Sequence, residues 1–163
     1  MALEIPNQEG ENINLFGHAR NFSQGVAAKK IARAMSIPGV AFHPSSITTI
    51  IRSDSEGWVG IPAGGDGGVS TEMIAPLILP HQATITSVLV IGTFAAAESW
   101  SIYKFQVTGT PSSFPAIATG SMNVKEENID ILIDNENFSY FLTTTALTID
   151  NDVLIAALLD YTS

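Results

Sequence analysis

The chain has 163 residues, of which 45% are hydrophobic and only 14% are charged, and its formal net charge is −9. This length suits one domain with its own hydrophobic core, and the negative charge argues against a nucleic-acid-binding protein, which needs clustered Lys and Arg. The chain contains no Cys, which excludes disulfides, thiolate nucleophiles and Cys-based metal sites.

Charge is distributed unevenly along the chain. Residues 1–52 carry a net charge of +2, whereas residues 53–163 carry a net charge of −11. A slightly basic N-terminal segment could dock onto the acidic body of a neighbouring copy through charge steering. The acidity also keeps an apolar protein in solution, so both interpretations stay open.

Residues 1–38 are expected to form an arm and one short amphipathic helix. Residues 1–22 contain Pro, Gly and Asn without a sustained hydrophobic period, which predicts an extended arm. Ser23 is a suitable N-cap for a helix over Gln24–Met35, and Pro38 ends this segment. The apolar face of the helix would contain Ala27, Ile31 and Met35.

No targeting or membrane-spanning segment is predicted. The first eleven residues are polar and acidic, unlike the basic and then apolar start of a secretory signal. No apolar run approaches the roughly 20 residues that a helix needs to cross a bilayer. The sequence leaves the compartment open, including an extracellular or particle-bound one.

From Gly39 onward the hydrophobic pattern changes to the period of two that is typical of β-strands. Turns rich in Gly, Asn and Asp separate the apolar runs, and little in this region has the pattern of a long helix. We therefore expect residues 39–163 to form an antiparallel β-sandwich or jelly roll. The expected strands are Val40–Phe42, Ile47–Arg52, Gly57–Ile61, Thr71–Leu79, Ala83–Gly92, Ser99–Thr108, Ser121–Val124, Asn128–Ile133, Phe138–Thr148 and Val153–Tyr161.

The expected strand Ser99–Thr108 carries apolar side chains on both faces. One face begins with Trp100 and Ile102 and ends with polar residues, and we assign the other face to the core. Trp100 and Ile102 are therefore expected to contact a partner at one end of the strand. The face assigned to the core contains Ser101, Tyr103, Phe105 and Val107.

The closing strand Val153–Tyr161 is also apolar on both faces, with Asp160 as its single charge. A strand of this kind lies either in the middle of a layered structure or at a subunit interface. For a two-layer sandwich of this size we favour the interface. The predicted oligomer interface comprises Ala27, Ile31, Met35, Trp100, Ile102, Leu154 and Leu158.

No catalytic, cofactor or metal site is predicted. The three His residues lie far apart and lack a short metal-ligand spacing, and no Gly-x-Ser-x-Gly sequence suggests a serine hydrolase. The oxygen-rich segments Asp134–Asn137 and Asp150–Asp152 resemble hairpin turns, although Ca²⁺ binding there stays open. We expect a chain that is not an enzyme.

A possible ligand rim lies in the middle of the chain. Aromatic side chains can stack on sugar rings, and Trp58 and Trp100 are the candidates for that role. The flexible turn at residues 64–68 would lie beside them. The predicted rim comprises Trp58, Gly64, Gly65 and Asp66.

The segment Leu79–Thr86 resembles a motif of poorly characterised jelly-roll-like β-sandwich proteins of bacteria and phages. In that group an apolar strand ends in Leu-Pro-His/Asp-Gly and is followed by Ala-Thr-Ile-Thr. The segments Ile133–Asn135 and Phe138–Phe141 and the terminal Tyr161 add to the similarity. The chain departs from the motif at Gln82, where Gly would be expected.

The resemblance covers residues 39–161 and implies a jelly-roll-like sandwich without catalytic residues. We expect a homo-oligomeric structural or interaction protein, with a trimer favoured, as a component of a viral or phage particle or of a fibre. The alternative is a carbohydrate-binding module of the same fold class.

Overall fold

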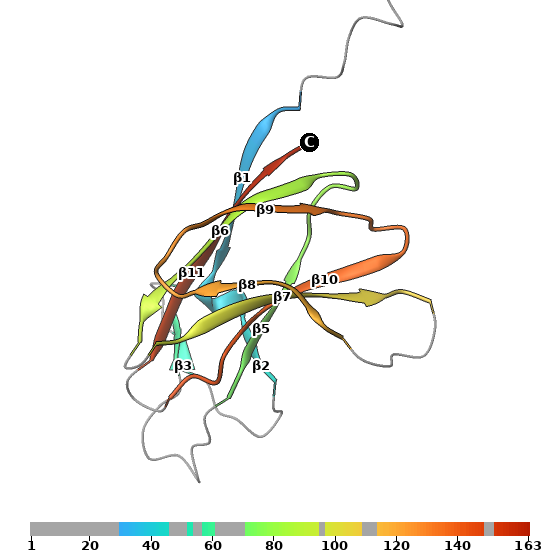
Figure 1. Cartoon of the computed structure of the whole chain (residues 1–163). Helices are drawn as coiled ribbons and strands as arrows, with labels where there is room; N and C mark the ends of the chain where they lie inside the picture. Colours follow the sequence, from blue (N-terminus) through green and yellow to red (C-terminus); the bar gives the residue numbers. More distant parts are fainter. Residues whose placement is uncertain are drawn as a thin grey trace, which may run out of the picture. The chain divides into compact units, whose positions relative to one another are not determined.

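The structure is a computed structural model that describes residues 30–45, 52–53, 57–60, 71–94, 97–108, 114–148 and 152–163. The chain divides into the units Met1–Lys30 and Ile31–Ser163, and the second unit contains the described strands. The described residues of this unit form an all-β fold with two antiparallel sheets, as predicted (Figure 1).

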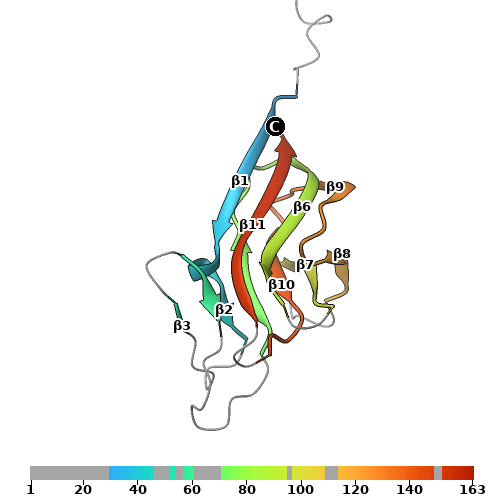
Figure 2. The same ribbon diagram turned by 90° about the vertical axis from the view of Figure 1, so that its left-hand side faces the viewer.

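The six-stranded sheet follows the order β3-β4-β11-β6-β9, and β1 pairs with β11 beside β4. Figure 2 shows β1, β11 and β6 side by side. The strands of this sheet are β1 (Ala32–Pro38), β3 (Arg52–Ser53), β4 (Val59–Gly60), β6 (Thr84–Thr93), β9 (Glu126–Leu132) and β11 (Val153–Thr162).

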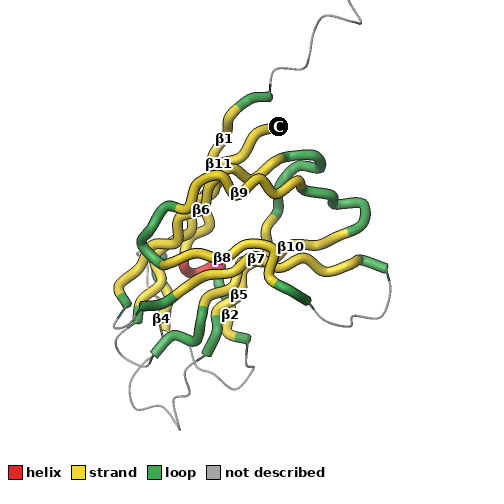
Figure 3. Tube along the Cα trace, viewed as in Figure 1, coloured by secondary structure: helices red, strands yellow, loops and turns green. Residues whose placement is uncertain are grey.

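The five-stranded sheet follows the order β2-β5-β10-β7-β8, and the chain crosses between the two sheets several times (Figure 3). A short 3₁₀ helix, η1 (Gly39–Ala41), replaces most of the strand expected at Val40–Phe42. The strands of the second sheet are β2 (His43–Pro44), β5 (Met73–Leu77), β7 (Ser99–Gln106), β8 (Ala116–Ser121) and β10 (Phe138–Thr144).

The hydrophobic core lies between the sheets and is built by alternate residues of the long strands. Fully buried side chains from the six-stranded sheet meet fully buried side chains from the five-stranded sheet. They include Ile85, Val88, Leu154 and Leu159 on one side and Met73, Trp100, Ile102 and Leu142 on the other.

Strand β7 buries the opposite face from the one assigned to the core. Trp100 and Ile102 are fully buried, whereas Tyr103 and Phe105 are half-buried on the outer face and Val107 is 58% exposed. Ile102 pairs with the buried Leu142 of β10, and this register fixes which face turns inward. The expectation that Trp100 and Ile102 contact a partner was therefore wrong.

A β-bulge in β11 changes which of its alternating positions face the core. Leu154 pairs with Gly92 and Ala156 pairs with Ile91, so Ile155 is an extra residue in β11. Such a bulge shifts the alternation of side chains, and Leu154 is buried before it whereas Ala157 is buried after it. The strand thus buries Leu154, Ala157 and Leu159, whereas Ile155 and Leu158 stay 45% and 40% exposed on the outer face.

The expected helix is wrong over its last six residues, because Lys30 and Ile31 are not helical and Ala32–Pro38 forms strand β1. This strand pairs with β11 over its whole length, from the pair Ala32 and Thr162 to the pair Pro38 and Ala156. The apolar residues of this segment fit both the helical period and the period of two of a strand. The hydrogen-bonded pairing with β11 selects the strand. Residues 24–29 of the expected helix lie outside the described residues.

The expected strand Ser121–Val124 is displaced, because β8 ends at Ser121 and a turn follows it. Asn123 adopts a positive φ of 61° in this turn. Its side chain accepts a hydrogen bond from the backbone N–H of Gly92 and donates one to the carbonyl of Gly92, each at 3.0 Å. The Asn123 amide thus makes the two hydrogen bonds with the Gly92 backbone that a neighbouring strand would otherwise make.

Candidate ligand-binding groove

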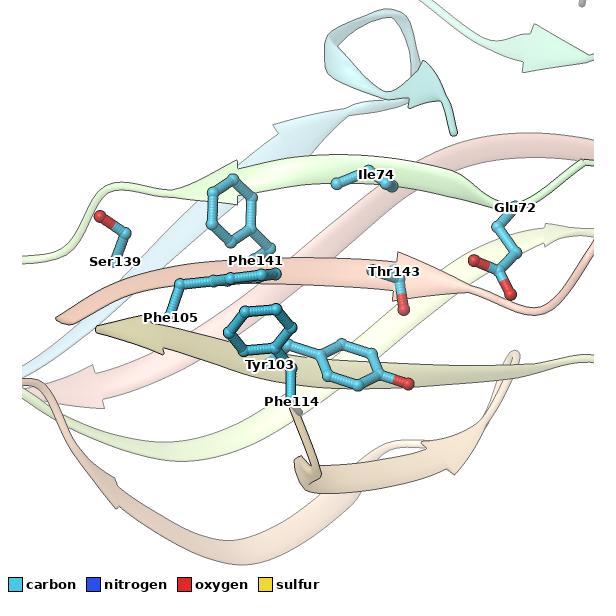
Figure 4. A pocket seen from close by; sticks show the side chains of 8 residues that line it. All are labelled: Glu72, Ile74, Tyr103, Phe105, Phe114, Ser139, Phe141 and Thr143. Carbon is cyan, nitrogen blue, oxygen red and sulfur yellow. The ribbon is translucent and has the colours of Figure 1, made fainter. Parts of the chain in front are cut away.

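An apolar groove of about 590 Å³ lies on the outer face of the five-stranded sheet. Its floor consists of the outward-facing residues of β5, β7 and β10, and the residue Phe114, just before β8, closes one side (Figure 4). The volume falls within the range of about 300–1,000 Å³ that is typical of ligand sites. The lining residues are Glu72, Ile74, Tyr103, Phe105, Phe114, Ser139, Phe141 and Thr143.

Three phenylalanine rings form the apolar end of the groove. The centroids of the Phe105 and Phe114 rings are 4.0 Å apart at an interplanar angle of 44°. Phe105 and Phe141 meet edge to face, with centroids 5.0 Å apart. All three rings are half-buried, so they hold one another in place and still offer ring surface to a ligand.

Oxygen atoms gather at the other end. Tyr103 lies directly opposite Phe141 in the β-ladder, and Thr143 lies one row further on, opposite Ile74. Figure 4 shows the Tyr103 hydroxyl, the Thr143 hydroxyl and the Glu72 carboxylate on the side away from the phenylalanine rings. The groove thus changes from aromatic to oxygen-rich along the strand direction.

The groove is negatively charged rather than positively charged. Glu72 is the one ionisable carboxylate among its described lining residues, and no Lys, Arg or His lines it. The neighbouring Lys104 lies instead against the ring of Phe138, with its Nζ 4.6 Å from the ring centroid.

The structure describes one residue of the predicted ligand rim, Trp58. Trp58 is half-buried before β4 and does not line the groove, while Gly64, Gly65 and Asp66 lie outside the described residues. Trp100 belongs to the core, where its indole N–H finds no acceptor among the described residues. The sequence signal that could have revealed the groove is that Ser99–Thr108 carries aromatic side chains on both faces. Alternation alone assigns the face of Tyr103 and Phe105 to the core.

The predicted interface residues are not brought together on one surface. Trp100, Ile102 and Leu154 are fully buried within their own chain, so they cannot contact a partner without unfolding. Ile31 and Leu158 are 55% and 40% exposed. The remaining two are Met35, which is half-buried on the inner side of β1, and Ala27, which lies outside the described residues.

Leu158 does belong to an aliphatic outer face on the six-stranded sheet. It lies opposite Leu89 of β6, and Ala156 lies opposite Ile91 in the neighbouring row. We call Leu89, Ile91, Ala156 and Leu158 the aliphatic face.

A polar network borders the aliphatic face. Asp160 accepts hydrogen bonds from Lys125 Nζ at 2.8 Å and from the Ser87 hydroxyl at 2.7 Å. These two bonds, that of Lys125 first, hold the pKa of the Asp160 carboxyl below its ordinary value.

The two segments that carry the family resemblance meet in space. The backbone N–H of Asn135 donates to Nδ1 of His81 at 3.2 Å, and the Asn135 side chain donates to the Leu79 carbonyl at 2.7 Å. Gln82 adopts a positive φ of 63°, a conformation that Gly adopts without strain. The Gly expected at this position therefore has a structural reason.

His81, Asp134 and Glu136 place three potential metal ligands within 4.8 Å of one another. However, Nδ1 of His81 accepts the Asn135 N–H, so in the neutral imidazole Nε2 carries the proton and offers no lone pair. The Asp134 carboxylate already accepts bonds from the Asn137 side chain and the Glu136 N–H. These bonds, that of Asn137 first, lower the pKa of Asp134. The arrangement fits a hydrogen-bonded turn better than a metal site.

The second oxygen-rich turn is described only at its end. Asp152 is buried, and its carboxylate accepts the backbone N–H and the hydroxyl of Thr148, each at 2.5 Å. Residues 150 and 151 lie outside the described residues.

No model of a known protein family, no curated protein and no solved structure matches the chain. The resemblance of Leu79–Thr86 to bacterial and phage proteins accordingly stays a prediction. In the part of the chain that the structure describes, no helix has the length and apolar character needed to cross a membrane.

Proposed function

We propose that this chain is a non-enzymatic binding module and that the groove on the outer face of its five-stranded sheet is the ligand site. The observation that carries this proposal is the cluster of half-buried rings formed by Phe105, Phe114 and Phe141. Apolar side chains left at a concave surface mark sites of interaction.

The chemistry of the groove supports binding rather than catalysis. Hydrolysis of a glycosidic bond needs two carboxyl groups on either side of the bond, whereas Glu72 is the one carboxylate among the described lining residues. The described lining residues contain no His, which is the side chain that most often serves as the base for a hydroxyl nucleophile.

The test is a titration of the isotope-labelled chain with millimolar benzyl alcohol, which combines an aromatic ring with a hydroxyl. We expect the backbone amide shifts to cluster on β5, β7 and β10 and to be lost in the Phe141→Ala variant. Leu132→Ala is the matched control, because Leu132 is 60% exposed on β9 of the other sheet. Shifts scattered over the surface, or unchanged by Phe141→Ala, would contradict the proposal.

A second candidate function is self-association through the aliphatic face. The specific observation is the exposed Leu158 opposite Leu89 on neighbouring strands of one sheet. A second copy that covered this face would remove apolar surface from water, which is favourable by about 25 cal/mol per Å². A trimer, and a setting in a fibre or a viral or phage particle, stay predictions within this candidate.

Light scattering coupled to size exclusion tests this candidate on the full chain. We expect an oligomer that keeps its mass on dilution, and a smaller species for Leu158→Glu, because a charge at the centre of an apolar contact is costly to bury. Leu132→Glu is the control for a charge placed elsewhere. A monomer at every concentration would refute self-association and leave the ligand-binding proposal intact.

A further inference from the structure

We infer that the ligand of the groove is a neutral carbohydrate, which binds with its ring faces on the phenylalanine end and its hydroxyls at the oxygen-rich end. This inference rests on the proposed function and specifies its ligand class.

The aromatic end suits the apolar face of a sugar ring. A pyranose presents C–H groups on its faces and hydroxyls around its edge, so it can stack on aromatic side chains without losing the hydration of its hydroxyls. Phe105 is held between Phe114 and Phe141 at centroid distances of 4.0 and 5.0 Å. Because these rings support one another, they are preorganised and lose little side-chain entropy on binding.

The oxygen-rich end supplies what sugar hydroxyls require. The Tyr103 hydroxyl can donate and accept a hydrogen bond, and the Glu72 carboxylate can accept two or more. The Thr143 hydroxyl donates to the Ser101 carbonyl at 3.5 Å, so it can accept a hydrogen bond from a ligand. Hydrogen bonds to a charged acceptor are stronger than those between neutral groups.

The dimensions allow more than one sugar ring. From Ser139 to Thr143 the groove follows β10 for five residues, which span about 13 Å of strand. We therefore expect an oligosaccharide to bind more tightly than its monosaccharide.

The charge of the groove disfavours anionic ligands. No Lys, Arg or His is present among its described lining residues, and Glu72 adds a negative charge. Residues 53–163 together carry a net charge of −11. Phosphorylated, sulfated and carboxylated ligands would be repelled from this surface, whereas a neutral sugar is not.

The position of the groove argues against an extended peptide as the ligand. Peptides that bind to β-sheets usually add a strand at a sheet edge, where backbone groups are unpaired. The floor of this groove is the face of β5, β10 and β7, whose backbones pair with one another. A fatty acyl chain is also disfavoured, because half-buried rings cannot enclose it.

The experiment measures binding of neutral cello-, xylo-, manno- and galacto-oligosaccharides to the full chain by amide shifts and calorimetry. We expect at least one series to bind, with affinity that rises with length. Phe141→Ala should weaken binding at least tenfold. Tyr103→Phe and Glu72→Gln should each weaken it about fivefold while leaving the fold intact, and Leu132→Ala should change nothing.

The outcomes separate the ligand class from the site. If benzyl alcohol shifts the groove amides but no oligosaccharide binds at millimolar concentration, the carbohydrate inference is wrong and the binding-module proposal stands. Binding of tetramethylammonium without any sugar would identify an aromatic cage for cations instead and refute the inference. Sugar binding that survives Phe141→Ala and Tyr103→Phe would place the carbohydrate elsewhere and refute it as well. If neither benzyl alcohol nor any sugar binds, both proposals fail.

Discussion

Replacing Gly39 by Ala should destabilise the sandwich strongly, because the backbone of β11 leaves no room for a side chain there. A Cβ at Gly39 would lie 2.2 Å from the carbonyl oxygen of Leu154 and 3.0 Å from that of Ile155, where ordinary contact begins at 3.4 Å. The carbonyl of Gly57 would lie 3.1 Å away. All three obstacles are backbone atoms, so no flexible side chain can move aside to restore contact distance.

The size of the effect follows from this geometry. Relief requires a backbone displacement of about 1.2 Å, the difference between 3.4 and 2.2 Å, in an interior that is close-packed. Overpacking of this kind costs about 1–3 kcal/mol, and the lower entropy of unfolded Ala returns about 0.4–1 kcal/mol. Because the obstacles are backbone atoms, the upper end of the overpacking cost applies, and we expect Gly39→Ala to lower the free energy of unfolding by about 2 kcal/mol.

Urea unfolding followed by circular dichroism measures this change. For an m-value of about 1–3 kcal/mol per M, a loss of 2 kcal/mol lowers the midpoint by about 1 M. Val40→Ala is the control, since Val40 is the next residue and is 41% exposed. It should lose less than about 0.5 kcal/mol. If Gly39→Ala and Val40→Ala had the same midpoint, the close approach of η1 to the bulge of β11 would be refuted.

Three further changes test local features of the fold. Gln82→Gly should raise the free energy of unfolding by about 0.5 kcal/mol in thermal unfolding, because the strain of a positive φ, about 1–2 kcal/mol, exceeds the entropic cost of Gly; a decrease would contradict the left-handed turn. Asn123→Gly should lower the free energy of unfolding by about 1 kcal/mol, because the two hydrogen bonds to Gly92 are lost. Asn123→Ala should lower it by about 1 kcal/mol more, because Ala is strained at a positive φ. Equal losses for the two variants would contradict the turn geometry. The lowered pKa of Asp160 means that its bond with Lys125 stabilises the fold above the ordinary carboxyl value of 3.8 and is lost as the pH falls below it. The Asp160→Asn variant should therefore lose less free energy of unfolding than the unchanged chain as the pH falls below about 4. The difference should be a few tenths of a kcal/mol, because the pair is exposed. The same pH dependence of stability in both proteins would contradict this.

The fold class could be predicted because the pattern that reports it is local. Alternating apolar residues between Gly, Asn and Asp turns indicated most of the long strands, and β6, β7, β10 and β11 lie within a few residues of their expected bounds. The alternation of the expected strand at residues 128–133 is also confirmed at its end, where Ile133 is buried and Leu132 is 60% exposed. Periodicity of this kind follows from strand geometry alone.

The helix and the bulge could not be predicted, because long-range pairing decides both. Residues 32–35 satisfy a helical and a strand period, and only the ladder with β11 selects the strand. The extra residue Ile155 exchanges the buried face of β11 partway along its length. A sequence that is apolar on both sides of a strand is thus compatible with an interface or with a bulge. In β11 the bulge accounts for part of the pattern, and Ile155 and Leu158 still lie exposed on the outer face.

The candidate site was missed for a related reason. Strand β7 carries Trp100 and Ile102 on one face and Tyr103 and Phe105 on the other, and a two-layer sandwich has only one interior. Whichever pair is buried, the other must lie outside, and the register with Leu142 buries the first pair. The outer pair then meets Phe141, which lies opposite Tyr103 on the adjacent strand. The groove therefore arises from aromatic residues that the core does not accommodate. A strand with aromatic side chains on both faces predicts an aromatic outer surface even when the orientation of the strand is unknown.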